Sequence, residues 1–453
     1  MIRVMEILKS FIDAFFEFKA YIMLPFFIII IGLIIRMPLG RLLKAALQLG
    51  TGFAGVFIVF SFFVDNIRPA VEQIIRVRGL DFPVLDVGWP PLAAITWSSP
   101  LAPLSIPFII LINIIMIALK TTRTIYIDIW NYWHLALIGA LLFAVSHNYF
   151  IAFAAITLIT IYTIKTADWT APYVFRESGL EGVTISPVSV VGLLPFAELM
   201  DSLYDRIPYV KKWNFNPHTG DSRLNQFADP MVIGFFMGIL LGIGAGYSVK
   251  TFLELGIHIA AVMYLLPKCG ELIGEGISPI SNSMKERIQN WFPGRSGLNV
   301  AVDTGILMNN KSVIVSGLIL MPIALGIALI LPGNRTLPLG DLPNLLSVIS
   351  VTVLISRGNV IRSVFTGIPV VVTFLLISSS MAELFTNLSQ GTGMDMGQGQ
   401  LITAFTDGGN HIRFYLYHLF QGNVIALASI PFIGLLLYLS HRRYKKNLKA
   451  EGL

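Results

Sequence analysis

Residues 20–36, AYIMLPFFIIIIGLIIR, are apolar up to the single arginine that ends them. A membrane-spanning helix needs about 20 mostly apolar residues, so this stretch predicts a first membrane span. Comparable stretches predict further full spans, and the set is 20–36, 43–64, 101–119, 125–145, 149–165, 230–247, 251–267, 312–331, 343–356, 361–380 and 414–438. The sequence therefore predicts an all-α polytopic membrane protein with about 11 transmembrane helices.

The composition also indicates a membrane protein. Of 453 residues, 55% are hydrophobic and only 13% are charged, whereas soluble proteins carry about 25% charged residues. This excludes a soluble enzyme, a disordered protein and a nucleic-acid binder. The single cysteine, Cys269, and the lack of an HExxH, P-loop or Rossmann signature predict neither a metal nor a cofactor.

The positions of the basic residues predict the topology. If the spans simply alternate, the Lys/Arg-rich connections all fall on one side, including the tail after the last span with Arg442, Arg443, Lys445 and Lys446. Basic loops face the cytoplasm. We therefore expect the N-terminus outside and the C-terminus inside.

Two short matches indicate an internal repeat. The segment from Lys44 to Gly50, KAALQLG, resembles that from Lys250 to Gly256, KTFLELG; likewise 123–128, RTIYID, resembles 335–341, RTLPLGD. Each unit would hold five spans, an odd number, so the second unit would enter the membrane inverted. That plan is typical of transporters whose site lies at the repeat interface. The alternative is chance similarity between short apolar strings.

Four further apolar stretches are too short to span the membrane. They lie at 84–100, 187–200, 298–310 and 400–410, and we expect re-entrant or half-membrane segments, with surface loops as the alternative. The predicted organisation is an amphipathic N-terminal helix at 1–19, a first repeat at 20–200, a cytoplasmic loop at 201–229, a second repeat at 230–410, and a last span with a basic tail at 411–453.

Polar residues inside these segments are the candidate binding residues, because an ionisable group at membrane depth is costly and usually marks a pathway. Asp86 opens the first re-entrant segment and can accept hydrogen bonds from substrate hydroxyls. Trp89 can stack on an apolar C–H face of a substrate. The alternative is an exposed turn with an interfacial tryptophan.

Two more candidates begin the fourth span. Asn131 and His134 are three residues apart and lie on one helix face. Neutral histidine offers both a donor and an acceptor, which suits a hydroxyl group. A histidine that only binds a neighbouring helix is the alternative. Asp128 precedes them, where it could equally face the membrane interface.

The second half supplies three candidates. Asp303 takes the place of Asp86 in the second repeat, and Asn309 follows it. Asn309 could instead cap the next helix. Asp407 lies in a Gly-rich stretch that permits close approach of a ligand but is also typical of a turn.

Several motifs in the same order resemble the galactitol-type membrane component (IIC) of the bacterial phosphotransferase system, over nearly the whole chain. They are DVGWP from Asp86, DIWNYWH ending at His134, PGN from Pro332 with LPLGD ending at Asp341, and RGN from Arg357. The sequence departs from the family pattern at two places. Glu181-Gly182 leads to Ile185-Ser-Pro-Val188 without the histidine that galactitol members often have there, at an expected pocket position, and Ser356 replaces the histidine expected before Arg357-Gly-Asn359. Galactitol is therefore the best guess among polyols and related sugars.

The resemblance, which extends to ascorbate-type IIC proteins, implies eleven spans, a mobile core domain, a V-shaped dimerisation motif and a homodimer that moves its core like an elevator. It implies that a separate IIB protein, charged through a IIA protein, phosphorylates the bound substrate from a phosphocysteine. The chain would then be a multi-pass translocation subunit of the cytoplasmic (inner) membrane of a bacterium and not an enzyme by itself. His134 and Asp303 match positions where the ascorbate carriers use His and Asp for substrate.

Two other functions remain open from the residues alone. An ion-coupled secondary transporter of the same architecture would use Asp86, Asp303 and His134 as ion sites and would release unmodified substrate. A membrane-embedded transferase would need a catalytic cluster at the interface, and the sequence offers none.

Overall fold

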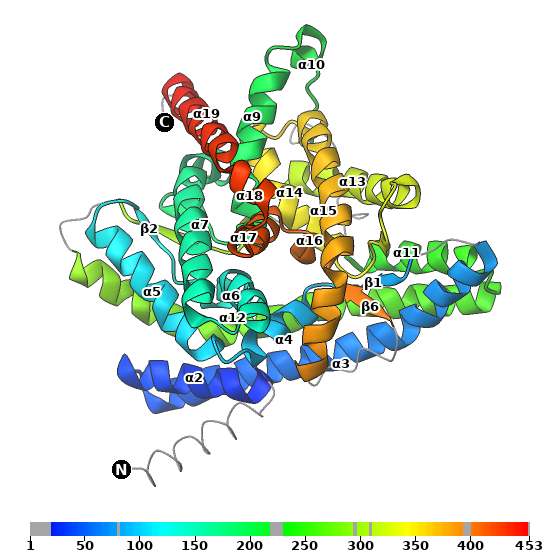
Figure 1. Cartoon of the computed structure of the whole chain (residues 1–453), viewed down its shortest axis with the longest axis horizontal. Helices are drawn as coiled ribbons and strands as arrows, with labels where there is room; N and C mark the ends of the chain where they lie inside the picture. Colours follow the sequence, from blue (N-terminus) through cyan, green and yellow to red (C-terminus); the bar gives the residue numbers. More distant parts are fainter. Residues whose placement is uncertain are drawn as a thin grey trace.

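The computed structural model describes residues 20–78, 82–217, 230–292, 297–307, 310–392 and 400–451. The predicted amphipathic helix at 1–19 and the candidate residue Asn309 lie outside this part of the chain. The described residues are mostly helical, in agreement with the predicted class (Figure 1).

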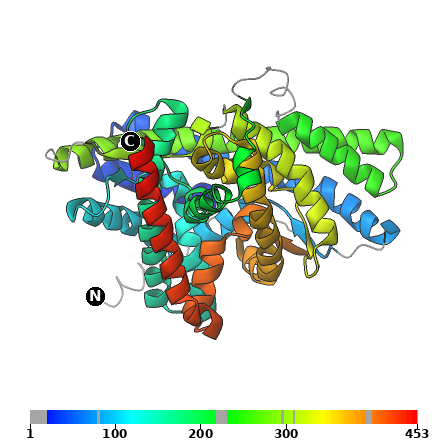
Figure 2. The ribbon, with the colours of Figure 1, turned by 90° about the horizontal axis from the view of Figure 1, so that it is seen from above.

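Two long helical hairpins form one side of the molecule (Figures 1 and 2). The first pairs α2 (Ala20–Ile34) with α3 (Leu39–Arg78), and the second pairs α11 (Pro230–Gly244) with α12 (Val249–Trp291). Helices α3 and α12 also pack along each other. Glycine permits the close contact within the second hairpin, because a Cβ added to Gly238 would lie 2.5 Å from the Cα of Gly256.

The rest of each half contains short strands and shorter helices. After the first hairpin come β1 (Val84–Asp86), α4 (Pro90–Ser98), α5 (Ala102–Ala118), β2 (Thr124–Ile125), η1 (Ile129–Asn131), α6 (Tyr132–Ser146), α7 (Tyr149–Ser178), β3 (Val183–Ile185), α8 (Val188–Val191), α9 (Leu194–Tyr204) and α10 (Pro208–Lys212). After the second come β4 (Asn299–Val302), η4 (Thr304–Leu307), α13 (Lys311–Ile330), β5 (Thr336–Leu337), η5 (Leu342–Asn344), α14 (Leu345–Ile355), α15 (Val360–Ser389), η6 (Gln390–Thr392), β6 (Leu401–Thr403), α16 (Phe405–Gly408), α17 (His411–Phe420), α18 (Val424–Ala428) and α19 (Ile430–Glu451).

The strands form two small parallel sheets, which the sequence analysis did not predict. Their orders are β5-β1-β6 and β2-β4-β3. In each sheet the central strand comes from one half of the sequence and both outer strands come from the other half. Asp86 pairs with Thr403, and Val302 pairs with Ile185. Backbone groups away from water need hydrogen-bond partners, and strand pairing supplies them where the short segments leave helical structure.

Six helical stretches are long and apolar enough to cross a membrane: Leu39–Ile67, Ile129–Ser146, Tyr149–Ser178, Val249–Trp291, Lys311–Ile330 and Val360–Thr392. Helices α4 and α5 form a further candidate, bent by 94°. These lengths support a polytopic membrane protein with six or seven such spans among the described residues. Helices α2, α11 and α14 have only 15, 15 and 11 residues, so the expected number of eleven is not confirmed.

The predicted last span, 414–438, is not one helix. It runs through α17, α18 and the first part of α19. Gly422 takes a left-handed conformation with φ of 75°, and the Asn423 side chain caps α18 by accepting hydrogen bonds from the amides of Ile425 and Ala426. A glycine in this conformation followed by a capping residue ends one helix and begins another.

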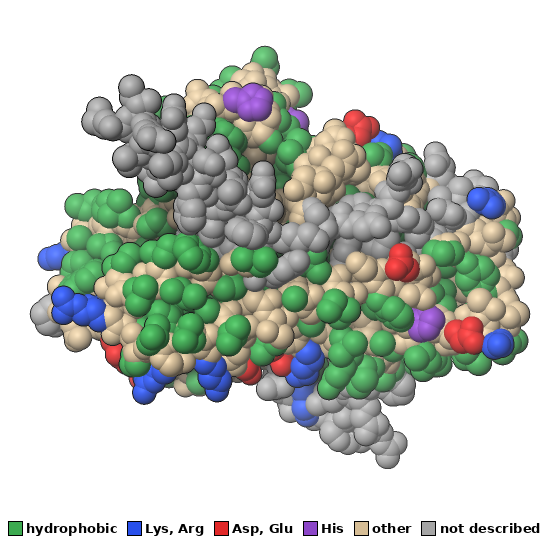
Figure 3. Space-filling view, turned by 90° about the horizontal axis from the view of Figure 1, so that it is seen from below, with side chains coloured by type: hydrophobic (Ala, Val, Ile, Leu, Met, Phe, Trp, Pro, Cys, Tyr) green, Lys and Arg blue, Asp and Glu red, His purple; other side chains and the backbone are tan. Residues whose placement is uncertain are grey.

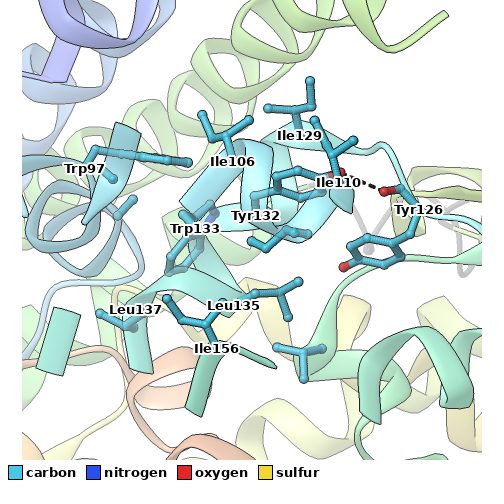
Figure 4. Packing of buried hydrophobic residues seen from close by; sticks show 14 of the residues in the cluster. Trp97, Ile106, Ile110, Tyr126, Ile129, Tyr132, Trp133, Leu135, Leu137 and Ile156 are labelled. Carbon is cyan, nitrogen blue, oxygen red and sulfur yellow. Dashed lines mark hydrogen bonds between the residues drawn. The ribbon is translucent and has the colours of Figure 1, made fainter. Parts of the chain in front are cut away.

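Apolar side chains occupy both the interior and much of the surface. Around α6, Figure 4 shows the buried rings of Tyr126, Tyr132 and Trp133, with the Tyr132 hydroxyl donating to the Tyr126 carbonyl at 2.7 Å. On the outside, Leu47 and Ile58 are each 71% exposed, and one face is largely hydrophobic (Figure 3). A surface of this kind suits a lipid environment.

Candidate functional site

The end of the β2-β4-β3 sheet gathers a first group of polar side chains, here called the Asp303 cluster: Asp128, Asn131, Ser186 and Asp303. Because β4 pairs with β3, Asp303 directly after β4 comes close to Ser186 directly after β3. The Asn131 side-chain amide donates to Asp128 and to Asp303, at 2.8 Å each. The Ser186 hydroxyl donates to Asp128 at 2.6 Å.

This first cluster is only partly enclosed. Asp303 is exposed and Asp128 is half-buried, whereas Asn131 is buried. Two carboxylates therefore share one amide donor at a place that a ligand can reach. Asn131 and Asp303, both predicted from the sequence as binding residues, are direct neighbours in the structure.

A second group lies at the centre of the molecule where α6, α16 and α17 meet (Figure 1). We call it the Asp407 cluster, and its members are His134, Asp341, Asn344, Thr406, Asp407 and Arg413. His134 Nδ1 lies 3.2 Å from Asp407 Oδ1, and Arg413 Nη2 lies 3.3 Å from the same oxygen. Arg413 Nη2 also donates to the Asp407 carbonyl at 2.5 Å. Two predicted residues, His134 and Asp407, thus come together here.

Asp341 supports the Asp407 cluster from the backbone side. Its Oδ2 accepts from the amides of Thr406 at 2.9 Å and Asp407 at 3.2 Å, and it also bonds the Thr406 hydroxyl. Asn344 Nδ2 donates to that hydroxyl at 2.9 Å. These contacts fix the short helix α16 and hence the direction of the Asp407 side chain.

Several atoms of this cluster have no hydrogen-bond partner in the described part of the chain. They are Asp341 Oδ1 and Arg413 Nε and Nη1. Nε1 of the neighbouring Trp133 is also without a partner there, and the contact of His134 Nδ1 with Asp407 lacks hydrogen-bond alignment. Asp341 is 1% exposed and Arg413 is 3% exposed. A buried polar atom without a partner costs about 1–3 kcal/mol. The cluster therefore offers unused donors and an unused acceptor inside an apolar protein.

Asp86 has a different surrounding from the one predicted. It is completely buried. Its Oδ1 accepts from the amides of Gly88 and Phe405, and its Oδ2 accepts from those of Leu339 and Asp341, over 2.8–3.2 Å. A carboxylate has about four lone-pair sites, and all four are used. This geometry favours a structural role for Asp86, which ties β1 to the segments that carry Asp341 and Asp407.

Trp89 lies in an aromatic group beside α6. Its ring centroid is 5.4 Å from that of Trp130 and 6.3 Å from that of Trp133. The guanidinium carbon of Arg413 lies 5.9 Å from the Trp133 ring centroid. Trp89 is half-buried, so part of its surface remains accessible.

Residues 14–399 match the family model of the PTS system sugar-specific permease component, EIIC-GAT. The chain belongs to this family. It is 32% identical over 434 residues to the galactitol-specific EIIC components of Escherichia coli K12 and Escherichia coli O157:H7, covering 95% of both chains in each case. It is also 32% identical over 417 residues to a putative permease IIC component of Escherichia coli K12, covering 92% of this chain and 93% of the relative.

Membership confirms the family resemblance and the role as a transport subunit of a phosphotransferase system. As an EIIC permease component, the chain is a multi-pass protein of the bacterial inner membrane that handles a sugar or polyol and works with soluble IIB proteins. The apolar helices agree with this setting.

Sequence reasoning missed two important residues of this EIIC component. Arg413 comes just before a predicted span, where an arginine is normally interpreted as a topology signal. Asp341 ends the segment that matched residues 123–128 in the proposed repeat, opposite Asp128. That match contained the signal for Asp341, because Asp128 belongs to the Asp303 cluster and Asp341 to the Asp407 cluster.

Proposed function

We propose that this EIIC component binds galactitol from outside the cell, carries it across the membrane and presents it to a separate phospho-IIB protein. Phosphoryl transfer from the IIB phosphocysteine would release the product inside as galactitol phosphate, so the chain contributes translocation and binding rather than the phosphoryl group. The similarity to galactitol-specific EIIC components over 95% of the chain supports this substrate.

The observation that carries the site assignment is the buried contact between His134 and Asp407. A neutral polyol leaves water only if hydrogen bonds replace its hydration, and the two clusters concentrate carboxylate, amide and imidazole groups in an apolar protein. We assign substrate contacts to Asn131, His134, Asp303 and Asp407. Trp89 would provide an apolar face. Asn309 follows the Asp303 cluster in the sequence, and we retain it as a candidate contact.

The order of the elements supports the proposed inverted repeat. Each unit begins with a helical hairpin and a strand, followed by a short helical segment (α4 or η4) and a helix of about five turns (α5 or α13). A second strand and a 3₁₀ turn then precede the next helix. The exchange of strands between halves in both sheets is what a two-fold relation would produce. In the proposed mechanism the hairpins α2–α3 and α11–α12 form the V-shaped motif of a homodimer, and the remainder moves as the core of an elevator. The N-terminus would be outside and the C-terminus in the cytoplasm.

An ion-coupled transporter of the same architecture predicts a different internal product. Uptake of labelled galactitol into right-side-out vesicles separates the two functions. Vesicles loaded with phosphoenolpyruvate and the soluble phosphotransferase proteins should accumulate galactitol phosphate, and vesicles without them should not accumulate label. Accumulation of unmodified galactitol driven by an ion gradient would overturn the proposal. A vesicle sample with the His134→Ala variant should accumulate neither form.

A further inference from the structure

We propose that Arg413 and Asp341 determine substrate specificity by holding neighbouring hydroxyl groups of the polyol between them. This inference rests on the proposed function, since it takes the Asp407 cluster as part of the polyol site. It assigns direct contacts to two residues outside the set Asn131, His134, Asp303 and Asp407.

Arg413 leaves hydrogen-bond donors unpaired among the described residues. Its Nη2 alone engages Asp407, through the carbonyl at 2.5 Å and Oδ1 at 3.3 Å. Nε and Nη1 have no partner among the described residues, although the side chain is only 4% exposed. A guanidinium carries five N–H donors and cannot lose its charge in a protein. Two nitrogen atoms of the permanently charged Arg413 side chain therefore carry N–H groups that have no acceptor among the described residues.

Asp341 has one carboxylate oxygen, Oδ1, without a partner among the described residues. Its Oδ2 accepts hydrogen bonds from the amides of Thr406 and Asp407, whereas its Oδ1 accepts none in the described part of the chain. Asp341 accepts from the Asp407 amide, and Arg413 donates to the Asp407 carbonyl. Both side chains that carry unused groups are therefore bonded to the same residue of α16.

These unpaired donors and this unpaired acceptor suit the hydroxyl groups of a polyol. Each hydroxyl of a polyol both accepts and donates a hydrogen bond. Arg413 Nε and Nη1 can donate to two hydroxyl oxygens, and Asp341 Oδ1 can accept a proton from one of them. An anionic ligand fits less well, because the carboxylates of Asp341 and Asp407 lie in the same cluster as the Arg413 guanidinium. The neighbouring Trp133, whose ring lies 5.9 Å from the guanidinium carbon, leaves its Nε1 as one more donor.

The test compares the affinities of the wild-type protein and of variants for galactitol and for its deoxy analogues. Purified protein in lipid nanodiscs is titrated calorimetrically with galactitol and with each of its single-deoxy analogues. For the wild-type protein we expect at least one analogue to bind about tenfold more weakly or worse, because a hydrogen bond to a charged group is lost. Wild-type binding of galactitol itself tests the proposed function.

Arg413→Lys keeps the positive charge beside Asp407 but lacks the guanidinium donors. The variant should bind galactitol about tenfold more weakly and should no longer distinguish it from the critical deoxy analogue. If Arg413 only balances charge, the Arg413→Lys variant loses affinity equally for every ligand and the discrimination survives, which would overturn the proposal. Arg335→Lys is the matched control, since Arg335 is 43% exposed beside Glu383, and it should behave as wild type.

Asp341→Asn provides a second variant in case Arg413→Lys does not fold. The Asn orientation that keeps the bonds of Oδ2 to the amides of Thr406 and Asp407 places an NH2 donor where the free acceptor was. Discrimination against the same analogue should therefore fall. Equal wild-type affinity for galactitol and all its deoxy analogues would overturn the inference without any variant. If galactitol does not bind but another hexitol does, the substrate proposal fails, and the deoxy analogues of that hexitol decide the roles of Arg413 and Asp341. If no hexitol binds, both proposals fail.

Discussion

His134 Nδ1 and Asp407 Oδ1 lie 3.2 Å apart, although His134 is at the start of α6 and Asp407 lies in α16, in the other half of the chain. The side chains are only 8% and 1% exposed. A buried contact between distant segments requires that both be held precisely, and Asp341 and Arg413 hold α16 for this purpose. We therefore expect substrate binding at the proposed site to depend on Asp341 and Arg413 as well as on His134.

The Asp407 carboxylate should be essential for both stability and transport. Asp407→Asn leaves Arg413 buried without its counter-charge, and breaking a buried ion pair costs about 3–5 kcal/mol. We expect a markedly lower melting temperature and loss of galactitol uptake. Glu383→Gln is the control, because the exposed pair of Glu383 with Arg335 at 3.7 Å should contribute at most about 1 kcal/mol. Equal effects of the two changes would contradict the buried ion pair.

Asp86→Asn should affect folding more than substrate recognition. An amide places N–H groups where the carboxylate accepts from four backbone amides, so donors face donors at an inaccessible site. We expect a loss of about 2–4 kcal/mol in the free energy of unfolding, since two buried hydrogen bonds are replaced by unpaired groups. Asp65→Asn on the exposed surface of α3 should change stability little. Unchanged stability together with weaker galactitol binding would restore Asp86 as a substrate ligand.

Asn131 should matter for affinity because it joins two carboxylates. Asn131→Ala removes the donor that Asp128 and Asp303 share, and the proposed hydroxyl contact disappears with it. We expect galactitol affinity to fall about tenfold, corresponding to about 1.4 kcal/mol. The matched control is Asn66→Ala, which removes only a hydrogen bond to the Phe62 carbonyl on α3. Wild-type affinity in Asn131→Ala would remove the Asp303 cluster from the site.

Asp303 should also promote release of the product. Phosphorylation adds about two negative charges to the ligand, and the exposed Asp303 carboxylate would repel them. In Asp303→Asn we expect slower release of labelled galactitol phosphate in single-turnover experiments with phospho-IIB. Unchanged release would mean that this repulsion does not drive product exit.

Replacing glycine by alanine in the second hairpin, α11–α12, should be tolerated only where the glycine does not face the other helix. Gly238→Ala would place Cβ 2.5 Å from the Gly256 Cα, whereas a Cβ at Gly270 meets no atom within 4 Å. Overpacking of this kind costs about 1–3 kcal/mol. Thermal unfolding should therefore distinguish Gly238→Ala from Gly270→Ala, and equal melting temperatures would contradict the close packing of α11 and α12.

The sequence alone determined the membrane class and most of the helices. Hydrophobicity over about 20 residues is a local property, so α3, α7, α13 and α15 could be recognised without a structure. It also singled out His134, Asp303 and Asp407 as candidates, because isolated polar residues in apolar surroundings are conspicuous. The family resemblance, carried by motifs such as that from Asp86, was confirmed by the comparisons.

Only the tertiary structure decided which of these residues meet. The short strands depend on pairing between segments from opposite halves, and a two- or three-residue strand has too little local pattern to be predicted. Strand pairing puts Asp303 beside Asn131. The assembled segments together fill every acceptor site of Asp86 and leave Arg413 Nε and Nη1 without partners among the described residues. Hydrogen-bond saturation is a property of the assembled neighbours, and for this reason the sequence identified Asp86 as a candidate ligand but did not reveal Arg413.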